Sequence, residues 1–192
     1  MLKYFSIAAM VAVLIIFATL GVAGQYYVDS NKFIYPKFSQ LTPEAQRQVT
    51  CLAGNIYFEA RSEPKEGQIA VAFVTLNRVE SSDFPNNICD VVTQKRRVES
   101  IGDRRLVCQF SWYCESKPKW QYYNAILTNN TTKKYDEVLD IAIYVYANQD
   151  KLKDPTNGSL YYHADYVKPN WRNLDKHVTI GRHIFYRVKE SI

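Results

Sequence analysis

The sequence predicts a mostly helical α+β fold, because three stretches of the 192-residue chain have helical patterns, two with apolar side chains at helical spacing and one that is apolar nearly all round. These stretches are residues 42–60, 67–79 and 135–149, whereas strand character is limited to the neighbourhood of Ile184-Phe185-Tyr186. Hydrophobic residues make up 47% of the chain, which excludes a disordered protein and suits one domain with a sizeable core.

The N-terminal segment, residues 1–23, differs from the rest of the chain. Residues 5–23 carry no charged side chain, follow Lys3 and are numerous enough to cross a bilayer as a helix. We expect a retained membrane anchor; the alternatives are a signal peptide cleaved near Gly21-Val22-Ala23, and a buried core helix. Anchor and signal peptide both place the remaining chain outside the cytoplasm. Residues 24–41 lack a clear period and are predicted to be a tether.

The first helix of the domain is predicted to begin at Thr42-Pro43-Glu44, which combines a hydroxyl N-cap, a proline in the first turn and an acid near the positive end of the dipole. Glu59 lies at the edge of its apolar stripe and Cys51 on the far side. Pro64 ends this helix and can start the next. The stripe consists of Val49, Leu52, Ala53, Ile56, Tyr57 and Ala60.

Gly67–Val79 is apolar nearly all round, which predicts a central, buried helix. Residues 81–87 are predicted to be a loop. Ile88–Gln94 is predicted to be a short helix, and the charged residues 95–105, which include Gly102, an exposed loop or a β-hairpin.

Towards the C-terminus, Tyr135–Gln149 has the pattern of an amphipathic helix. Residues 154–158 are predicted to form a turn. Residues 159–188 mix tyrosines, histidines and basic residues.

Four cysteines lie at positions 51, 89, 108 and 114. An even number behind an export signal predicts two disulfides, and the sequence leaves all three pairings open. The competing interpretation, a zinc site, is disfavoured because no Cys-x-x-Cys pair is present.

The net charge of +5 favours anionic surroundings such as cell-wall polymer, a membrane surface or nucleic acid. The basic residues are scattered and form no nucleic-acid-binding motif, so we expect no nucleic-acid partner. Fifteen tyrosines and three tryptophans indicate either an aromatic-rich core or a groove in which sugars stack.

Glu59 is the strongest candidate for chemistry. It stands in the apolar, aromatic run Asn55–Ala60, where a carboxyl group is expected to resist ionisation. A carboxylic acid kept protonated near neutral pH is what cleavage of a glycosidic bond requires. The alternative is an ordinary helix glutamate paired with Arg61 or Arg78.

Several ordered blocks over roughly residues 50–188 resemble the SleB/CwlJ family of cell wall hydrolases, in its proteobacterial and phage-borne branch. Ser62 departs from the family, which has glycine there. The blocks are Ile56–Arg61, Glu63-Pro64, Glu66–Ala72, Asn77-Arg78-Val79, Phe84-Pro85-Asn86, Cys108–Trp112, Tyr162–Val167 with Pro169 and Trp171, Gly181-Arg182-His183 and Phe185-Tyr186.

The resemblance implies a small lysozyme-like domain, here residues 42–192, that cleaves the MurNAc–GlcNAc bond of peptidoglycan with Glu59 as catalytic acid. The spore enzymes of this family are lytic transglycosylases, and we expect that activity here, with no cofactor and no metal. A hydrolase would instead need a second carboxylate. The candidates for it are Glu63, Glu66, Asp90, Glu115 and Asp165.

Eight residues are predicted to bind substrate: Tyr57, Gln109, Ser111, Trp112, His163, Asp165, Tyr166 and Trp171. The alternative interpretation of residues 109–112 is a structural loop that is bracketed by a disulfide. His163 and Asp165 with His177 or His183 would, as a second alternative, bind zinc in an amidase or peptidase, although no defined metal motif is present. A third alternative is that the whole protein is an inactive wall-binding or assembly factor. We expect a monomer whose partners are glycan strands and, through an uncleaved N-terminal segment, the membrane.

Overall fold

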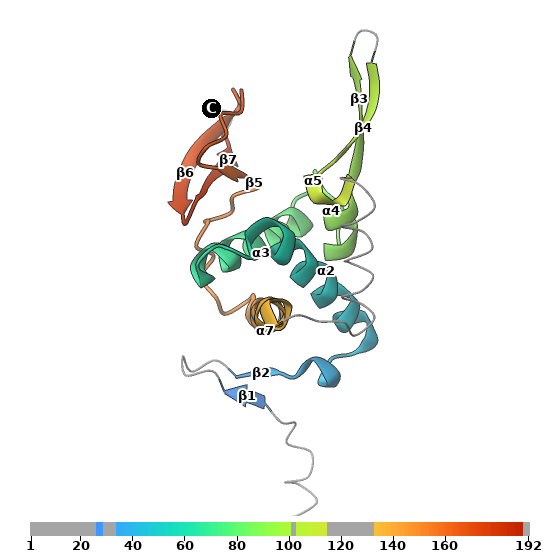
Figure 1. Cartoon of the computed structure of the whole chain (residues 1–192), viewed down its shortest axis with the longest axis vertical. Coiled ribbons are helices and arrows are strands. Elements are labelled where there is room, and N and C mark those ends of the chain that lie inside the picture. The colour runs from blue at the N-terminus through green and yellow to red at the C-terminus, as the bar shows by residue number, and fades with distance from the viewer. Residues whose placement is uncertain (1–25, 29–33, 101–102, 115–132, 190–192) are drawn as a thin grey trace, which may run out of the picture.

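The computed structural model describes residues 26–28, 34–100, 103–114 and 133–189, and it consists of a layer of helices with β elements on two sides (Figure 1). The helices are η1 (Phe38–Gln40), α2 (Pro43–Ala60), α3 (Lys65–Glu80), α4 (Ile88–Thr93), α5 (Ser111–Cys114) and α7 (Lys133–Asn148). The predicted helices are therefore confirmed.

The strands form three antiparallel groups. They are the pair β1 (Tyr26–Val28) and β2 (Ile34–Pro36), the hairpin β3 (Lys95–Ser100) and β4 (Asp103–Cys108), and the sheet of β5 (Tyr161–Ala164), β6 (Leu174–Ile180) and β7 (His183–Val188), in the order β5-β7-β6. The α+β class is confirmed, with more strand than predicted in the C-terminal segment. The hairpin and the three-stranded sheet rise from the same side of the helical layer, and β1 and β2 lie on the opposite side (Figure 1).

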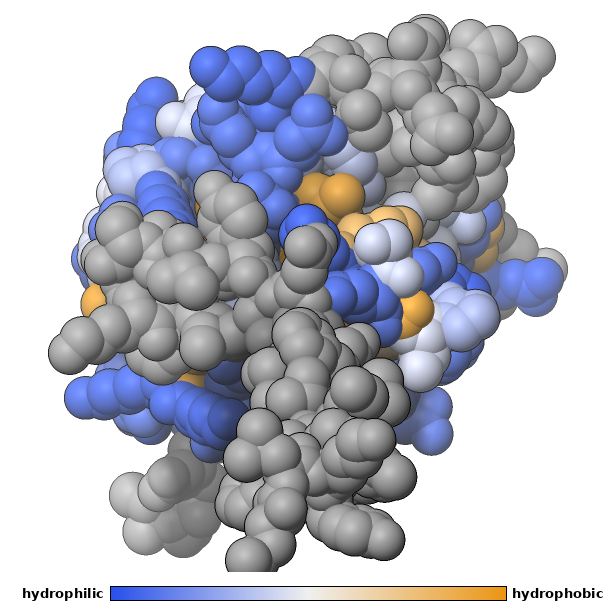
Figure 2. All heavy atoms as spheres, turned by 90° about the horizontal axis from the view of Figure 1, so that it is seen from below, coloured by the Kyte–Doolittle hydropathy of each residue, from blue (hydrophilic) through white to orange (hydrophobic). Residues whose placement is uncertain are grey.

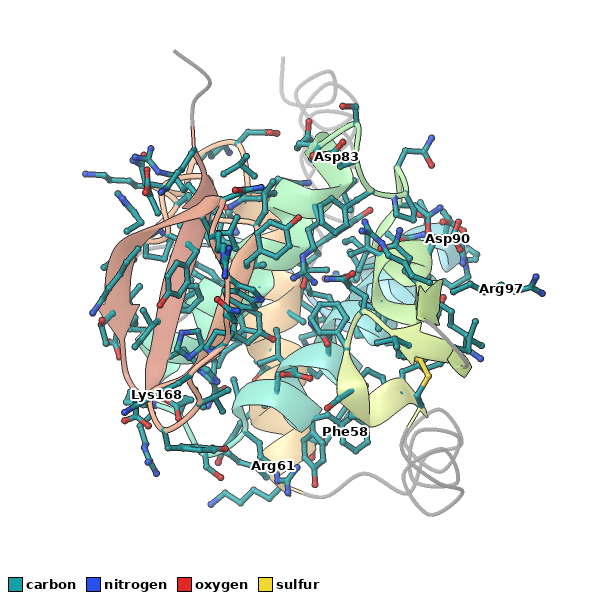
Figure 3. All side chains as sticks on the ribbon, turned by 90° about the horizontal axis from the view of Figure 1, so that it is seen from above. Phe58, Arg61, Asp83, Asp90, Arg97 and Lys168 are labelled. Atoms are coloured by element: carbon teal, nitrogen blue, oxygen red, sulfur yellow. A yellow bond between two sulfur atoms is a disulfide. The ribbon has the colours of Figure 1, made fainter. Side chains whose placement is uncertain are left out.

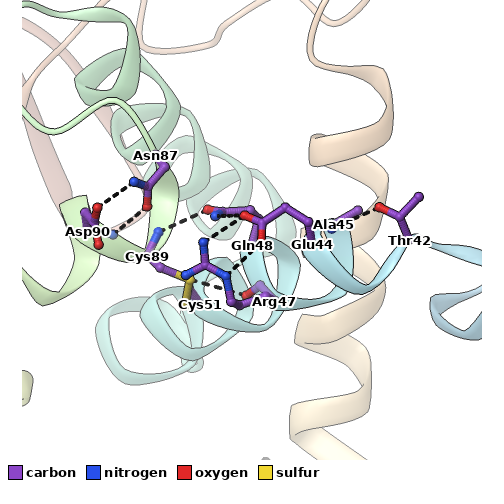
Figure 4. Close-up of polar contacts among 9 residues, drawn as sticks. All are labelled: Thr42, Glu44, Ala45, Arg47, Gln48, Cys51, Asn87, Cys89 and Asp90. Carbon is purple, nitrogen blue, oxygen red and sulfur yellow. Dashed lines mark hydrogen bonds and ion pairs between the residues drawn. A yellow bond between two sulfur atoms is a disulfide. The ribbon is translucent and has the colours of Figure 1, made fainter.

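Helix α2 begins as the sequence predicts. The backbone N–H of Ala45 donates a hydrogen bond of 3.2 Å to the Thr42 hydroxyl, and Pro43 occupies the first turn. In the same first turn, Glu44 accepts hydrogen bonds from the side chains of Arg47 and Gln48, one turn further along the helix (Figure 4). The Thr42 side chain thus satisfies one of the first backbone N–H groups of the helix, and Pro43 has no backbone N–H to satisfy.

Helix α3 is buried on two sides, which explains its nearly continuous apolar sequence. On one side Val71 and Phe73 belong to the main core, where α3 meets α2 and α7. On the other, Ala70 and Val74 pack against Phe185 of the three-stranded sheet. The prediction of a central helix is confirmed, because α3 is the element on which both the helices and the sheet pack.

A buried polar chain crosses the helical layer. The Asn55 side chain is fully buried and donates a hydrogen bond of 3.1 Å to the Thr75 hydroxyl. Its oxygen accepts a hydrogen bond of 3.0 Å from the indole N–H of Trp112. Because both ends of the amide are satisfied, Asn55 fixes α5 against α2 and α3 at little cost.

The predicted tether contains structure that packs on the domain. Tyr35 in β2 is buried and meets Tyr144 of α7 edge-on, with 5.8 Å between ring centroids. The described surface on this side is mainly hydrophilic with a few small hydrophobic areas (Figure 2). The predicted anchor, residues 5–23, lies outside the described residues, and no helix among the described residues is long and apolar enough to cross a membrane. The division into anchor, tether and domain stays a prediction.

The prediction of two disulfides is confirmed. Cys51 pairs with Cys89, which joins α2 to α4 (Figure 4), and Cys108 pairs with Cys114, which joins the end of β4 to α5. The first bridge closes a loop of sequence separation 38 and the second a loop of separation 6. The longer loop restricts the unfolded chain more.

We therefore predict different costs for removing the two bridges. The double variant Cys51→Ala/Cys89→Ala should lower the free energy of unfolding by about 4 kcal/mol, and Cys108→Ala/Cys114→Ala by about 2 kcal/mol, from loop-closure entropy. Denaturant unfolding without reductant measures both. Equal losses for the two pairs would contradict this account.

Candidate active site

The half-buried carboxylate of Glu59 links the helical layer to the sheet. The Tyr162 hydroxyl, on β5, donates a hydrogen bond of 3.1 Å to Glu59 Oε2 near the end of α2. Burial raises the pKa of Tyr162 well above its usual value, and the Glu59 charge and the hydrogen bond to it raise it further. Tyr162 therefore remains a protonated donor wherever Glu59 is ionised.

Tyr162 is held in place by the neighbouring strand. Its ring meets His183 edge-on at 5.1 Å and tilts against Phe185 at 5.6 Å, and residues 162 and 185 are direct partners in the β5–β7 ladder. Phe185 is fully buried against α3. The tyrosine thus stands on a rigid sheet packed on the same helix layer that carries Glu59.

The last turns of α3 fix the segment that leads into β5. The Asn77 amide donates hydrogen bonds to Asp154 Oδ2 at 2.9 Å, to the Thr156 hydroxyl at 3.3 Å and to the Ser159 carbonyl at 3.1 Å. Arg78 Nε donates one of 2.8 Å to the Leu160 carbonyl. These contacts set where β5 starts, and therefore where Tyr162 meets Glu59.

Arg78 is a buried cation beside this pair. Its side chain lies over the rings of Phe110, Phe84 and Tyr161, at 4.8, 5.3 and 5.9 Å from their centroids. Burial lowers the pKa of Arg78, while Tyr162, Tyr161 and Glu59 act in the opposite direction. Such rings partly replace the solvation that a cation loses on burial.

Trp112, whose sugar-binding role stays a prediction, is buried in the structure. Trp112 is only 4% exposed, and its ring stacks on Phe58 with 4.5 Å between centroids. The indole face is therefore covered by a neighbouring side chain. Tyr57, also predicted to bind substrate, is 8% exposed and packs edge-on against Phe58 and Tyr135. Both residues support the backbone around Glu59.

Gln109 and Ser111 flank the buried Phe110 within the disulfide-bracketed segment. The backbone N–H of Gln109 donates to the Gln94 carbonyl at 2.9 Å, and Ser111 is exposed at the start of α5. The structural interpretation of this segment is supported by that bond and the disulfide. A substrate contact by either side chain stays a prediction.

The remaining predicted substrate residues lie on β5 and in the connection from β5 to β6. His163 Nε2 is hydrogen-bonded to the Tyr186 hydroxyl at 2.9 Å, and Trp171, which is 39% exposed, meets both rings edge-on. Tyr166 is 75% exposed, with the Arg182 guanidinium 5.4 Å from its ring centre. These side chains offer an aromatic surface open to solvent.

Three candidates for a second carboxylate, Glu63, Asp165 and Asp90, have structural partners. Glu63 Oε2 accepts the backbone N–H of Arg182 at 2.8 Å, and Asp165 binds the Arg182 guanidinium at 3.1 Å. Asp90 pairs with Asn87 at the start of α4 and lies at the periphery, apart from Phe58 and Arg61 near Glu59 (Figure 3).

Glu66 is exposed in the first turn of α3, and Glu115 lies outside the described residues. None of the hydrogen bonds and ion pairs described for Glu63, Glu66, Asp90 and Asp165 joins them to Glu59.

The proposed zinc ligands are not gathered into a site. Asp165 is paired with Arg182, His163 with Tyr186, and His183 is buried, which lowers its pKa. Among the described residues no group of three or more histidine, cysteine, aspartate or glutamate side chains is arranged to hold a metal ion.

Sequence reasoning did not assign Tyr162 and Arg78 to the site, although both stand in the family-like blocks. Arg78 could have been found from the sequence, because it is an arginine in a helix that is otherwise apolar nearly all round. A charged side chain is rarely buried unless it has a partner or a function. The Tyr162–Glu59 contact joins residues 103 positions apart, and no local pattern encodes it.

A glycine holds the turn that Glu63 binds. Gly181 has a φ of +57°, and a Cβ there would overlap Glu63 Oε2. Gly158 has a φ of +82°, but a Cβ there would meet no atom within 4 Å. Both glycines therefore have a left-handed backbone, and only Gly181 also lies against Glu63.

We predict that Gly158→Ala lowers the free energy of unfolding by about 1 kcal/mol, the cost of the left-handed backbone. Gly181→Ala should cost about 2–4 kcal/mol, since Glu63 must also release the Arg182 N–H. Denaturant unfolding of both variants measures the difference. If they lost the same stability, Glu63 would not be constrained by this turn.

Comparison with known proteins places the chain in a family. The sequence matches the family described as Cell Wall Hydrolase over residues 62–186, a range that contains Arg78 and Tyr162 and begins just after Glu59. The spore cortex-lytic enzyme of Bacillus cereus is 32% identical over 143 residues, which are 73% of this chain and 44% of that protein. The enzyme of Oceanobacillus iheyensis is 31% identical over 143 residues, 73% of this chain and 42% of that protein.

Two solved structures are also similar. The catalytic domain of the Bacillus cereus SleB protein has 26% identity and a TM-score of 0.47, covering 74% of this chain and 91% of that one. The catalytic domain of the germination-specific lytic transglycosylase SleB from Bacillus anthracis has 26% identity and a TM-score of 0.47, covering 77% and 98%. The chain spans less than half the length of the curated relatives it matches. Because the family match covers more than half of its residues, this chain belongs to the cell wall hydrolase family.

Proposed function

We propose that the protein cleaves the glycan strands of peptidoglycan at the MurNAc–GlcNAc bond, as a lytic transglycosylase that uses Glu59 alone. The observation that carries the proposal is the hydrogen bond from Tyr162 to Glu59, which fixes a half-buried carboxyl group between two rigid layers in a chain of the cell wall hydrolase family. Curated relatives named as spore cortex-lytic enzymes support the same substrate class.

In the first step the protonated Glu59 gives its proton to the oxygen that links the two sugars. The C1–O bond of MurNAc breaks, the GlcNAc side leaves with a hydroxyl group, and an oxocarbenium-like centre develops at C1. In the second step the Glu59 carboxylate takes the proton of the MurNAc 6-hydroxyl, whose oxygen attacks C1 and closes a 1,6-anhydro ring. Glu59 ends protonated, and no water is consumed.

Tyr162 suits both steps. Its hydroxyl donates a hydrogen bond to one oxygen of Glu59, which restricts the rotation of the carboxyl group. The hydrogen bond is stronger to a carboxylate than to a neutral acid, so it helps Glu59 release its proton. A second carboxylate is not needed, which agrees with the structural partners of Glu63, Asp90 and Asp165.

The glycan is proposed to run across the aromatic surface of the sheet. Trp171 and Tyr166 present exposed rings for sugar faces, and His163 and Asp165 present polar groups beside them. Gln109 and Ser111 would contact the strand from the opposite side of Glu59. In this proposed arrangement, polar groups surround apolar aromatic rings, and a sugar needs both kinds of contact.

We also propose that the protein works as a monomer in the cell envelope after export. Peptidoglycan, its proposed substrate, lies outside the cytoplasm, and two disulfides suit an oxidising compartment. The apolar residues 5–23 would anchor it in the inner membrane unless they are cleaved as a signal peptide.

Replacing Glu59 by glutamine tests the proposal. Glu59→Gln keeps the size of the side chain but removes the transferable proton, so release of soluble fragments from purified peptidoglycan should fall at least about a hundredfold. Glu66→Gln, the same exchange at an exposed glutamate of α3, is the matched control and should stay near the parent rate. A folded Glu59→Gln protein that digests peptidoglycan normally would remove Glu59 from the reaction.

Chelation separates glycan cleavage from metal-dependent peptide cleavage. We expect digestion to survive exhaustive treatment with EDTA, because proton transfer by Glu59 involves no metal ion. Fragment release is measured with and without chelator and after adding zinc. Activity that is lost and then restored by zinc would support an amidase or peptidase instead.

A further inference from the structure

We propose that Arg78 is a positioning residue for Glu59: a buried positive charge, placed beside Tyr162, that stabilises the Glu59 carboxylate left after proton donation. This inference rests on the proposed function and adds a residue to it. Its role would be electrostatic and conformational, because Arg78 is only 4% exposed and does not reach a polymeric substrate.

The environment of Arg78 is costly for a residue with only a structural role. Its Nε is satisfied by the Leu160 carbonyl, and its guanidinium is surrounded by the rings of Phe84, Phe110 and Tyr161. Its Nη1, however, is buried with no hydrogen-bond partner in the described part of the chain. A neutral donor would satisfy Leu160 without burying a charge, so the retained cation calls for a further explanation.

The charged and titratable groups around Arg78 supply that explanation. Arg78 holds the Leu160 carbonyl, two residues before Tyr162, and among the charged groups near it Glu59 favours its charged form while Arg96 from the hairpin opposes it. Tyr162 also meets the ring of His183 edge-on, and the charged and titratable groups around His183 are Glu63, Asp165 and His163. The carboxylate that acts on Arg78 from α2 is therefore Glu59, the group that must change charge during the reaction.

The sign of the effect follows from that change. A protonated Glu59 gains little from a nearby cation, whereas the carboxylate formed in the transition state gains more. Arg78 therefore lowers the barrier of the first step and keeps Glu59 ready as a base for the second. Because Tyr162 stays protonated beside it, the hydroxyl donates to Glu59 in both states.

The pH dependence of peptidoglycan digestion tests this role. The alkaline limb of kcat/KM reports the loss of the proton from the catalytic acid. In Arg78→Met, which removes the charge at similar length, that limb should move to higher pH by about one unit, with at least about a tenfold lower rate at the optimum. Arg78→Lys keeps the charge and should leave the limb in place with at least about a tenth of the parent rate.

Asn77→Ala is the structural control, since it releases the same Asp154–Leu160 segment without changing any charge. It should lower stability or rate without moving the limb. A folded Arg78→Met protein with an unmoved limb overturns the inference. If Arg78→Met does not fold, Arg78→Lys decides: a folded lysine variant with less than about a tenth of the rate would mean that guanidinium shape, and not charge, is what matters.

These outcomes are distinct from failure of the proposed function. If the parent protein does not cleave glycan, or if Glu59→Gln digests normally, the proposed function itself fails. If the parent cleaves glycan, Glu59→Gln does not and the Arg78→Met limb is unmoved, only the role of Arg78 is lost.

Discussion

The contacts made by Asn77 and Arg78 at the end of α3 hold the sheet to the helices, and the arrangement of the site depends on them. Three hydrogen bonds from Asn77 and one from Arg78 fix the segment between Asp154 and Leu160. That segment leads directly into β5, so its position decides where the Tyr162 hydroxyl lies. Without this connection the sheet would be held to α3 mainly by the small cluster of Ala70, Val74 and Phe185.

The site is consequently built from rigid elements. Glu59 stands on a helix whose position is fixed by a disulfide to α4 and by the buried Asn55 amide. Tyr162 stands on a strand paired with β7, and the turn before β7 is bound by Glu63 from the α2–α3 connection. Two independent links therefore join the helices to the sheet on either side of Tyr162, which restricts how far the hydroxyl can move from Glu59.

The helices were predictable because their signal is local. The N-cap at Thr42, the proline after it and the apolar periodicity of α2, α3 and α7 are all encoded within a few neighbouring residues. The three-stranded sheet was underestimated, because β6 and β7 are stabilised by pairing with each other and with β5 and their outer faces are exposed.

The individual site residues also divide into those with local sequence signals and those whose role depends on distant contacts. Trp112 was predicted to contact sugar because its type and motif suit that role, but its indole N–H is satisfied by Asn55 and its face by Phe58, partners that lie far away in the sequence. The cysteine pairing and the Tyr162–Glu59 contact likewise depend on how distant segments fold together. Glu59 itself was predicted from its apolar surroundings and its place in a motif, which are local features.

The most direct test of the account is the chemical nature of the ends that the protein is proposed to leave on glycan strands. Purified peptidoglycan is digested, treated with borohydride and analysed by mass spectrometry. A single carboxylate that acts first as acid and then as base predicts mainly 1,6-anhydro-MurNAc ends, which take up no hydrogen from borohydride. MurNAc ends that are reduced by borohydride would mean that water attacks C1, and would contradict the assignment of both steps to Glu59 alone.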